Sequence, residues 1–354
     1  MRVKLGDVCE RGTSNLKLSD VSEKNGEFSV FGASGYIGSV DFYQQGYPYV
    51  AVVKDGAGIG RAMLCPGKTS VIGTMQYLLP KDNILPKYLF YVVKYMNLEK
   101  YFTGATIPHI YFKDYKNEEF NFDFWERQVE IVSVLSKCEK VIDLCKQELQ
   151  LLDKLIKARF VELFGDPVSN SYGLPEATLP DLGEFGRGVS KHRPRNDIKL
   201  LGGKYPLIQT GDVANAGLYI TSYSSTYSEL GLKQSKMWDK GTLCITIAAN
   251  IAKTAILEFD ACFPDSVVGF IANERTNNIF VHYWFSFFQA ILESQAPESA
   301  QKNINLKILS ELKVIVPEKR KQDQFASFVK LTDKSKVAVQ KALDLSLIHI
   351  SEPT

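Results

Sequence analysis

Basic and amide side chains are concentrated in one segment of the sequence, residues 187–204. This segment carries six Lys and Arg residues and a single acid, Asp197. Lys and Arg neutralise phosphates and pair with guanine edges, whereas Asn suits adenine edges, so the composition predicts a DNA-contacting loop. A solvated basic surface is the alternative. The candidate contacts in this segment are Arg187, Lys191, His192, Arg193, Arg195, Asn196 and Lys204.

Other candidate contacts lie outside this segment. Arg61 and Lys253 each follow a Gly- or Ala-rich turn, from which a long cation can reach a phosphate. Their alternative is an exposed loop charge, and the alternative for the amide and hydroxyl candidates is turn capping. The remaining candidates are Lys68, Thr106, His109 and Lys113 in the first half, and Gln301, Lys302 and Asn303 in the second.

Signatures of catalysis are missing from the sequence. It contains no GxxxxGK[ST] phosphate loop and no N/D-P-P-Y/F methyltransferase tetrapeptide. The glycines of residues 55–60 alternate instead of following GxGxxG, and the four histidines lack metal-ligand spacing. We therefore expect a chain that is not an enzyme and holds no cofactor or metal. A fused methyltransferase with an unrecognised site is the alternative.

Three pairs of similar stretches, about 190–200 residues apart and in the same order, indicate an internal repeat. Such a repeat predicts a pseudo-dimer within one chain, and pseudo-dimers often read targets that come in two halves. The paired stretches are 49–64 with 243–257, 69–73 with 265–269, and 127–135 with 321–329.

Two long segments without Gly or Pro predict helices that pair as a coiled coil. In residues 124–164, apolar residues recur at alternating steps of three and four, and Gly165 and Pro167 end the pattern. The second segment, from Glu318, has a weaker pattern in the same register. We expect the two helices to pack antiparallel because each follows its own globular domain. The predicted contact line, called the seam below, comprises Leu135, Cys138, Ile142, Cys145, Leu149, Leu152, Ile156, Arg159 and Leu163, with Val329, Thr332, Lys336, Val339 and Leu343.

The predicted fold class is α+β. The segments outside the long helices have short apolar runs, such as 49–53 and 243–248, between tight turns, and helices at 86–98 and 281–295. Each predicts a mixed or mostly β domain. The expected divisions are a first domain (1–123), a central helix (124–167), a second domain (168–317), a shortened second helix (318–345) and a tail (346–354) that we interpret as non-native.

Bulk composition is that of ordinary globular protein. The chain is 45% hydrophobic and 23% charged, with a net charge of +2, which neither favours nor excludes nucleic acid. Its six cysteines lack CxxC spacing, and no apolar run of about 18 residues predicts a membrane span. We therefore expect reduced thiols, a cytoplasmic location and no membrane partner.

The order domain, long helix, domain, long helix resembles the specificity subunit of type I restriction–modification systems. Local stretches carry the same resemblance, which extends from residue 1 to about 345. The end of the central helix (155–167) looks like that family's, and so do the recognition-domain loops at 32–38, 104–110, 186–196 and 206–213.

The resemblance implies a DNA-reading role without catalysis. Each domain, a target-recognition domain in this family, would read one half of a split double-stranded DNA target. The helices would set the gap and dock methyltransferase subunits, which restriction–translocase subunits join. S-adenosylmethionine, ATP and Mg²⁺ would then bind to those partner subunits. A coiled-coil adaptor and an inactive, truncated specificity subunit are the alternatives.

Overall fold

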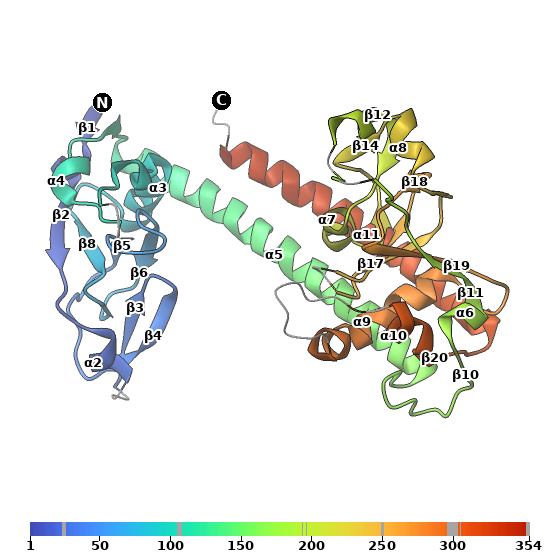
Figure 1. Ribbon diagram of the computed structural model, residues 1–354. Coiled ribbons are helices and arrows are strands. Elements are labelled where there is room, and N and C mark those ends of the chain that lie inside the picture. The colour runs from blue at the N-terminus through green and yellow to red at the C-terminus, as the bar shows by residue number, and fades with distance from the viewer. Residues whose placement is uncertain are drawn as a thin grey trace. The chain divides into compact units, whose positions relative to one another are not determined.

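The computed structural model describes residues 1–354 except 23–25, 105–107, 193, 196, 249–250, 296–303, 305 and 352–354. Contacts divide the chain into two compact units, 1–141 and 142–354 (Figure 1). The division falls within helix α5 (Trp125–Phe164). Residues Ile131 and Val132 of α5 pack on the core of the first unit, whereas Phe160 and Phe164 belong to the core of the second.

The first unit combines small sheets with short helices. Pro86 stands at the first position of its longest complete helix, and Asn97 ends that helix in the left-handed region. Its elements are β1 (Arg2–Lys4), α1 (Leu5–Val8), β2 (Cys9–Thr13), α2 (Leu18–Ser22), β3 (Phe28–Gly32), β4 (Gly35–Val40), β5 (Tyr49–Val53), β6 (Ala62–Cys65), β7 (Ser70–Val71), β8 (Met75–Pro80), α3 (Pro86–Met96), η1 (Leu98–Tyr101), α4 (Phe112–Tyr115) and β9 (Glu119–Asn121).

Strand β5 lies at the centre of the first unit. It pairs antiparallel with β6 and β8 in a sheet of order β2-β8-β5-β6, beside a second sheet of order β4-β3-β7. Every residue of β5 is buried, because alternate side chains point to opposite faces. Val50 and Val52 pack with α3, while Tyr49, Ala51 and Val53 pack with residues of β3 and β7.

The second unit repeats this plan with longer helices. Its elements are β10 (Glu176–Ala177), α6 (Leu179–Leu182), β11 (Gly183–Arg187), η2 (Ile198–Leu200), β12 (Leu201–Leu207), α7 (Thr210–Asn215), β13 (Tyr219–Ile220), β14 (Ser225–Tyr227), α8 (Glu229–Lys233), β15 (Met237–Trp238), β16 (Leu243–Thr246), β17 (Thr254–Leu257), β18 (Ala261–Cys262), β19 (Val267–Ala272), α9 (Asn278–Gln295), α10 (Leu306–Glu311), β20 (Val314–Ile315) and α11 (Lys319–Ser351).

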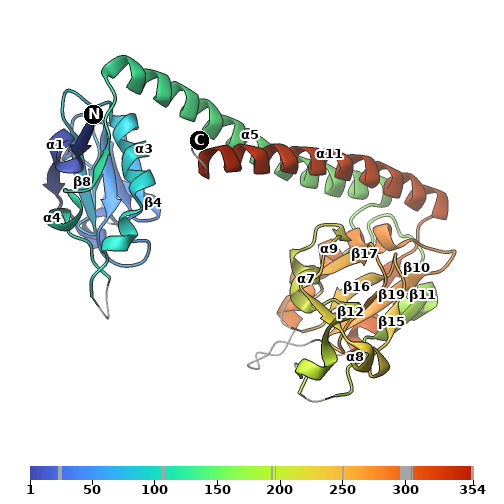
Figure 2. The same cartoon turned by 90° about the horizontal axis from the view of Figure 1, so that it is seen from above.

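Strand order confirms the internal repeat. The sheet β11-β19-β16-β17-β13 contains the order β2-β8-β5-β6 of the first unit, with one added strand. The sheet β14-β12-β18-β15 likewise extends the order β4-β3-β7 by one strand. Strand β3 pairs antiparallel with β4 and parallel with β7, and β12 pairs in the same way with β14 and β18. Helices α3 and α9 follow the equivalent strands β8 and β19. Each packs on the sheet of its own unit that contains that strand (Figure 2).

Helices α5 and α11 pack antiparallel in the second unit, as predicted. Phe160 and Phe164 of α5 contact Phe325 of α11. Asp153, earlier in α5, pairs with Lys336, later in α11, so the two helices run in opposite directions. In Figures 1 and 2, α11 runs beside the later part of α5. Every predicted seam residue is buried or half-buried. Gly165 ends α5 at a φ of +75°, a conformation that glycine adopts without strain.

Several features differ from the predictions. Helix α3 ends at Met96, before the predicted residue 98, and α11 continues to Ser351, beyond the predicted end at residue 345. Helix α9 begins at Asn278, before the predicted start at residue 281, because the Asn278 side chain bonds the backbone N–H of Ala272 and the carbonyl of Gly241. Phe160 and Phe164 lie outside the predicted seam but are fully buried, because α5 also packs on the core of the second unit. Among the described residues, no helix is both long and apolar enough to cross a membrane.

Candidate nucleic-acid interface

In the first unit, the turn between β5 and β6 lies against the loop that follows η1. Ile110 donates its backbone N–H to the Lys54 carbonyl, and His109 Nδ1 lies 2.6 Å from Asp55 Oδ1. Burial raises the pKa of the Asp55 carboxyl, but hydrogen bonds from Lys54 and His109 outweigh burial and hold this pKa below its usual range. The carboxylate therefore fixes His109 in place within the loop.

Arg61 joins the same turn to the hairpin of β3 and β4. Its Nη1 donates to the Ala33 carbonyl at 3.2 Å, and its guanidinium covers Gly58, where a Cβ would lie 2.5 Å from Nη2. The side chain is still exposed, so its remaining N–H groups face solvent. Arg61 thus holds the tip of the hairpin, and its exposed guanidinium is also a candidate to contact a DNA phosphate.

Two further lysines of the first unit are exposed. Lys68 lies in the turn before β7 with a φ of +56°. Lys113 lies with its Nζ 5.4 Å from the ring centroid of Tyr111, and that ring stacks on His109 at 6.3 Å. His109, Tyr111 and Lys113 therefore form one exposed group of a cation and two rings.

The basic segment of the second unit is held by a glutamine from α8's C-terminal end. Gln234 Oε1 accepts the backbone N–H groups of Lys191 at 2.7 Å and His192 at 3.0 Å. His192 Nε2 also lies 3.1 Å from Asp197 Oδ2. A backbone hydrogen bond from Lys199 is the main cause that holds the pKa of the Asp197 carboxyl below its usual range. These bonds give the segment a defined path.

Carboxylates from elsewhere in the chain neutralise part of this segment. Arg195 pairs with Asp265, and Lys204 Nζ lies 3.4 Å from Glu229 Oε1 and over the ring of Tyr205. Arg187 and Lys191 are exposed, and within the described part of the chain neither has an ion pair. Lys199 of the same segment is also exposed and has no ion pair among the described residues, so these three cations are the best placed to contact phosphate.

A cavity of about 270 Å³ beside the segment brings together side chains that the sequence did not single out. Gln209, Thr210 and Ser266 line it together with Arg195. A guanidinium, an amide and two hydroxyls are the groups that read base edges. Gln209 and Thr210 belong to the stretch 206–213, which resembles the family, and that resemblance was the available signal.

Lys253 lies in a different environment from Arg61, although both close equivalent turns. Its carbonyl accepts the backbone N–H of Thr246, as the Arg61 carbonyl accepts that of Val53. Its side chain is half-buried and lines a cavity of about 280 Å³ with Asp153 of α5 and Lys336 of α11. The structure thus places Lys253 beside the helix pair, and its DNA contact remains a prediction.

The other predicted contacts cannot be placed. Thr106, Arg193, Asn196, Gln301, Lys302 and Asn303 lie outside the described residues. Over the described residues, no group of three or more His, Cys, Asp or Glu side chains is arranged to hold a metal ion.

Sequence comparison relates this chain to type I restriction specificity subunits. The family model for the type I restriction modification DNA specificity domain matches residues 1–154 and 176–347. Two specificity subunits of Methanocaldococcus jannaschii are similar in sequence. The proposed type I restriction enzyme MjaX specificity subunit is 22% identical over 308 residues, 80% of this chain and 72% of that protein. The type I restriction enzyme MjaIX specificity subunit is 26% identical over 179 residues, 45% of this chain and 40% of that protein.

A solved structure is similar in fold. The crystal structure of the type I restriction–modification system S subunit from M. genitalium aligns with a TM-score of 0.66 and 17% identity, covering 99% of this chain and 94% of that chain. The alignment supports the repeat of domain and helix over nearly the whole chain. Because the family model matches well over half of the sequence, the resemblance is confirmed: this protein belongs to the type I restriction modification DNA specificity family, whose members recognise the DNA target.

Proposed function

We propose that each unit of this chain reads one half of a bipartite double-stranded DNA target and that the helix pair sets the gap. The observation that carries the proposal is the repeat, in which both units have the same strand order and are each followed by a long helix. A repeated reader on a fixed spacer suits a target with two half-sites. The loops differ between units, so the two half-sites would differ in sequence.

Basic and amide groups supply the DNA contacts in this proposal. Arg187 and Lys191 in the second unit, and Arg61, Lys68 and Lys113 in the first, are exposed cations for phosphates and guanine. His109 stacks on Tyr111, whose ring Lys113 contacts, and is held by Asp55. The assignment also includes Lys253 and the candidates outside the described residues, which follow from their positions in the sequence.

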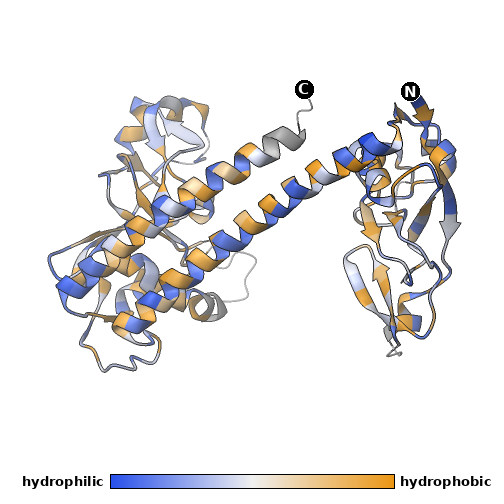
Figure 3. Cartoon of the chain, turned by 180° about the vertical axis from the view of Figure 1, so that it is seen from behind, coloured by the Kyte–Doolittle hydropathy of each residue, from blue (hydrophilic) through white to orange (hydrophobic). Residues whose placement is uncertain are grey.

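The helix pair carries a second line of apolar residues, which we call the apolar stripe. It comprises Leu144, Leu151 and Leu155 of α5 with Leu331, Ala338, Ala342 and Leu345 of α11, all exposed. Leu151 and Leu331 are 62% and 68% exposed, whereas the neighbouring seam residues are buried or half-buried. Apolar colour between polar turns is visible along both helices in Figure 3.

Both halves of the apolar stripe face the same side of the pair. Each α5 residue of the stripe immediately precedes a seam residue, and so do Leu331, Ala338 and Ala342 of α11. Because one residue corresponds to about 100° around a helix, all of these side chains lie about 100° from the seam in the same sense. The two-fold axis of an antiparallel pair is perpendicular to the plane of the helices, so equivalent positions lie on one face. A broad apolar face suits partner helices. We assign it to methyltransferase subunits.

The same proposal places the chemistry on partners. S-adenosylmethionine would bind to the methyltransferase subunits, and ATP and Mg²⁺ to restriction–translocase subunits that join the assembly. This chain would contribute DNA recognition and docking without catalysis. The family to which the chain belongs supports this division of roles.

An exchange of one recognition domain tests the proposal. Residues 1–123 would be replaced by the equivalent segment of a family member with another target, in a host that expresses the methyltransferase encoded beside this chain. Methylome sequencing should show one half of the methylated motif changed and the other half and the gap retained. Strains with the original chain and without it provide the controls. A change in both halves, or in neither, would contradict the proposal.

A further inference from the structure

Gln128 of α5 and Gln322 of α11 are buried amides at equivalent places in the repeat. Each is the fourth residue of its helix, and each is 0% exposed. A buried amide is stabilising only when its donors and its acceptor are all paired. The contacts of the two side chains are therefore informative.

Both amides make a three-point contact, in which Nε2 donates to two backbone carbonyls and Oε1 accepts one hydrogen bond. Gln128 Nε2 donates to the carbonyls of Asn83 at 3.0 Å and Asp123 at 2.9 Å, and its Oε1 accepts the backbone N–H of Leu85 at 2.9 Å. These partners come from the segment that enters α3 and from the residues that enter α5. The bonds thus tie the first turn of α5 to the body of the first unit.

In the second unit, Gln322 Nε2 donates to the carbonyls of Arg275 at 3.0 Å and Pro317 at 2.8 Å. Its Oε1 accepts from the Thr276 hydroxyl at 2.9 Å. Arg275 and Thr276 lie in the segment that enters α9, the counterpart of α3, and Pro317 precedes α11. The repeat therefore conserves the geometry of the contact between its two copies.

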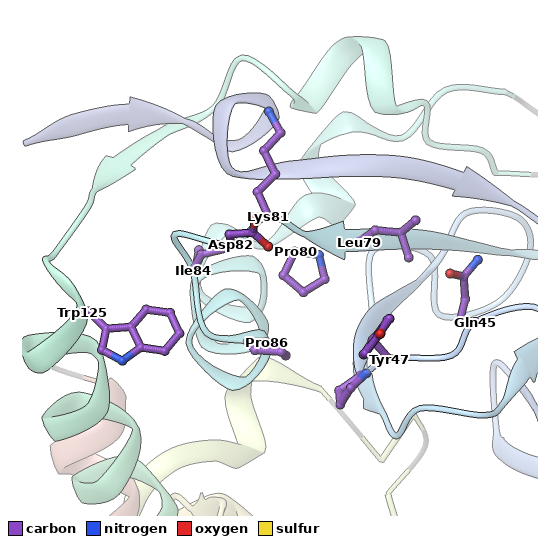
Figure 4. Close-up of a pocket in the computed structure, with 10 residues that line it drawn as sticks. Gln45, Tyr47, Leu79, Pro80, Lys81, Asp82, Ile84, Pro86 and Trp125 are labelled. Carbon is purple, nitrogen blue, oxygen red and sulfur yellow. The ribbon is translucent and has the colours of Figure 1, made fainter.

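The two helices differ in what supports the glutamine. Within residues 125–141, all of which are described, Gln128 is the one fully buried side chain of α5. Trp125 is 46% exposed beside an open cavity of about 480 Å³ that Ile84 and Pro86 also line (Figure 4). By contrast, α11 also buries Phe325, Ala326 and Val329 in the core of the second unit.

We propose that Gln128 and Gln322 are positioning residues that fix the direction in which each long helix leaves its unit, and thereby the gap length that the protein selects. This inference rests on the proposed function. Helix α5 has 40 residues. A tilt of about 5° at the root of a helix about 60 Å long moves its far end by about 5 Å, more than the roughly 3.4 Å rise of one base pair. Gln128, with less apolar support, carries more of this selectivity.

Gap selectivity is measured by methylome sequencing of hosts that express the neighbouring methyltransferase with the original chain or a variant. Gln128→Met keeps the side-chain volume and removes the three hydrogen bonds. We expect the share of methylated sites whose gap is one base pair longer or shorter to rise about tenfold, with both half-site sequences unchanged. Gln322→Met should give a smaller rise, and Gln128→Asn, which keeps a shorter amide, an intermediate one.

Gln76→Met is the matched control, because Gln76 is 3% exposed, bonds Tyr115 at 3.1 Å and makes no hydrogen bond to a long helix. It should leave the gap unchanged. Circular dichroism of each purified chain reports folding. If Gln128→Met proves to be unfolded, the Gln128→Asn variant is used to test the inference. A single gap retained in the folded Gln128 variants, or an equal loss at every gap, would overturn the inference. In this experiment, failure of the proposed function itself would show as the absence of a bipartite motif with the original chain.

Discussion

His282 of α9 and Thr254 of β17 form a partly buried hydrogen bond, with 2.9 Å between Nδ1 and Oγ1. Their counterparts in the first unit are apolar. His282 is the fifth residue of α9, as Phe90 is of α3, and Thr254 begins β17, as Ala62 begins β6. Phe90 and Ala62 both pack against the core of the first unit. The second unit thus has a hydrogen-bonded histidine and threonine at the two positions where the first unit has apolar side chains.

This pair should make the stability of the second unit depend on pH. Burial, with the charge of Lys336, lowers the pKa of His282 from 6.5 to about 4. The unfolded chain therefore binds the proton first, so the contribution is fully present above pH 6.5 and is lost as pH falls toward 4. The loss amounts to up to about 3 kcal/mol of unfolding free energy.

The double variant His282→Phe, Thr254→Ala tests this dependence by introducing the residues of the first unit. We expect it to fold and to show a smaller pH dependence of the unfolding free energy between pH 6.5 and 4 than the original chain, as measured by urea unfolding, because the contribution of His282 is removed. The single variant His282→Phe should cost about 1–3 kcal/mol at pH 7, because the Thr254 hydroxyl loses its partner. Equal slopes for the original chain and the double variant would contradict the assignment.

Asp333 of α11 should destabilise the helix pair at neutral pH. Burial and then the nearby Asp153 carboxylate raise the pKa of Asp333, although Lys336 opposes them. Because the folded chain holds this proton more tightly, the destabilisation appears as pH rises through the raised pKa and vanishes below the ordinary one. Asp333→Asn should therefore raise the free energy of unfolding at pH 7 by roughly 0.5 kcal/mol, which thermal unfolding reports as a higher melting temperature. Asp344→Asn on the same helix serves as the exposed control, and a gain that persists unchanged below pH 3 would exclude this explanation.

Features that depend on local spacing could be predicted from the sequence. The steps of three and four between apolar residues identified the seam of α5 and α11, and the similarity of 49–64 to 243–257 identified the repeat. Phe160 and Phe164 were missed because spacing within a helix identifies one face, while the second face of α5 is defined by the strands and helices of the second unit.

Pairing between distant residues could not be predicted. Asp265 lies 70 residues from Arg195, so a count of acids within residues 187–204 overestimated the free charge of that segment. In the same way, Asp55 lies 54 residues from His109, and nothing in the sequence indicated that pair. Gln234 has no distinguishing sequence context. The paired stretches 127–135 and 321–329 align Gln128 with Gln322, but only the fold brings backbone groups within reach of these amides. The sequence therefore supplied the candidate cations, but it could not show which of them are paired with distant carboxylates.

Lys191 and Lys204 should differ in their effect on DNA binding. Lys191 is exposed without an ion pair among the described residues, whereas Lys204 lies 3.4 Å from Glu229. Lys191→Ala should reduce the slope of log affinity against log salt concentration by about 0.9, the value for one lost phosphate contact. Lys204→Ala should change this slope less. Fluorescence anisotropy of the purified complex on a duplex with the methylated motif measures both, and equal slopes for Lys191→Ala and the original complex would remove Lys191 from the interface.

Leu151 should be required for docking of the methyltransferase subunit. It is 62% exposed at the centre of the apolar stripe, so a charge there is tolerated in the free chain. Leu151→Glu should leave the free energy of unfolding within about 0.5 kcal/mol of the original. In the complex, the same carboxylate would be buried without a partner, so binding should weaken by at least about tenfold.

Gln150→Glu provides the matched control for this last test, because it adds the same charge at the neighbouring exposed position, away from the stripe. Co-purification and titration with the methyltransferase subunit should distinguish the two variants. Since Leu151 is remote in sequence from every candidate DNA contact, the DNA affinity of the chain alone should be the same for both. Equal binding of the methyltransferase subunit by the two variants would show that the apolar stripe is not its docking face, and the exposed leucines would then need another partner.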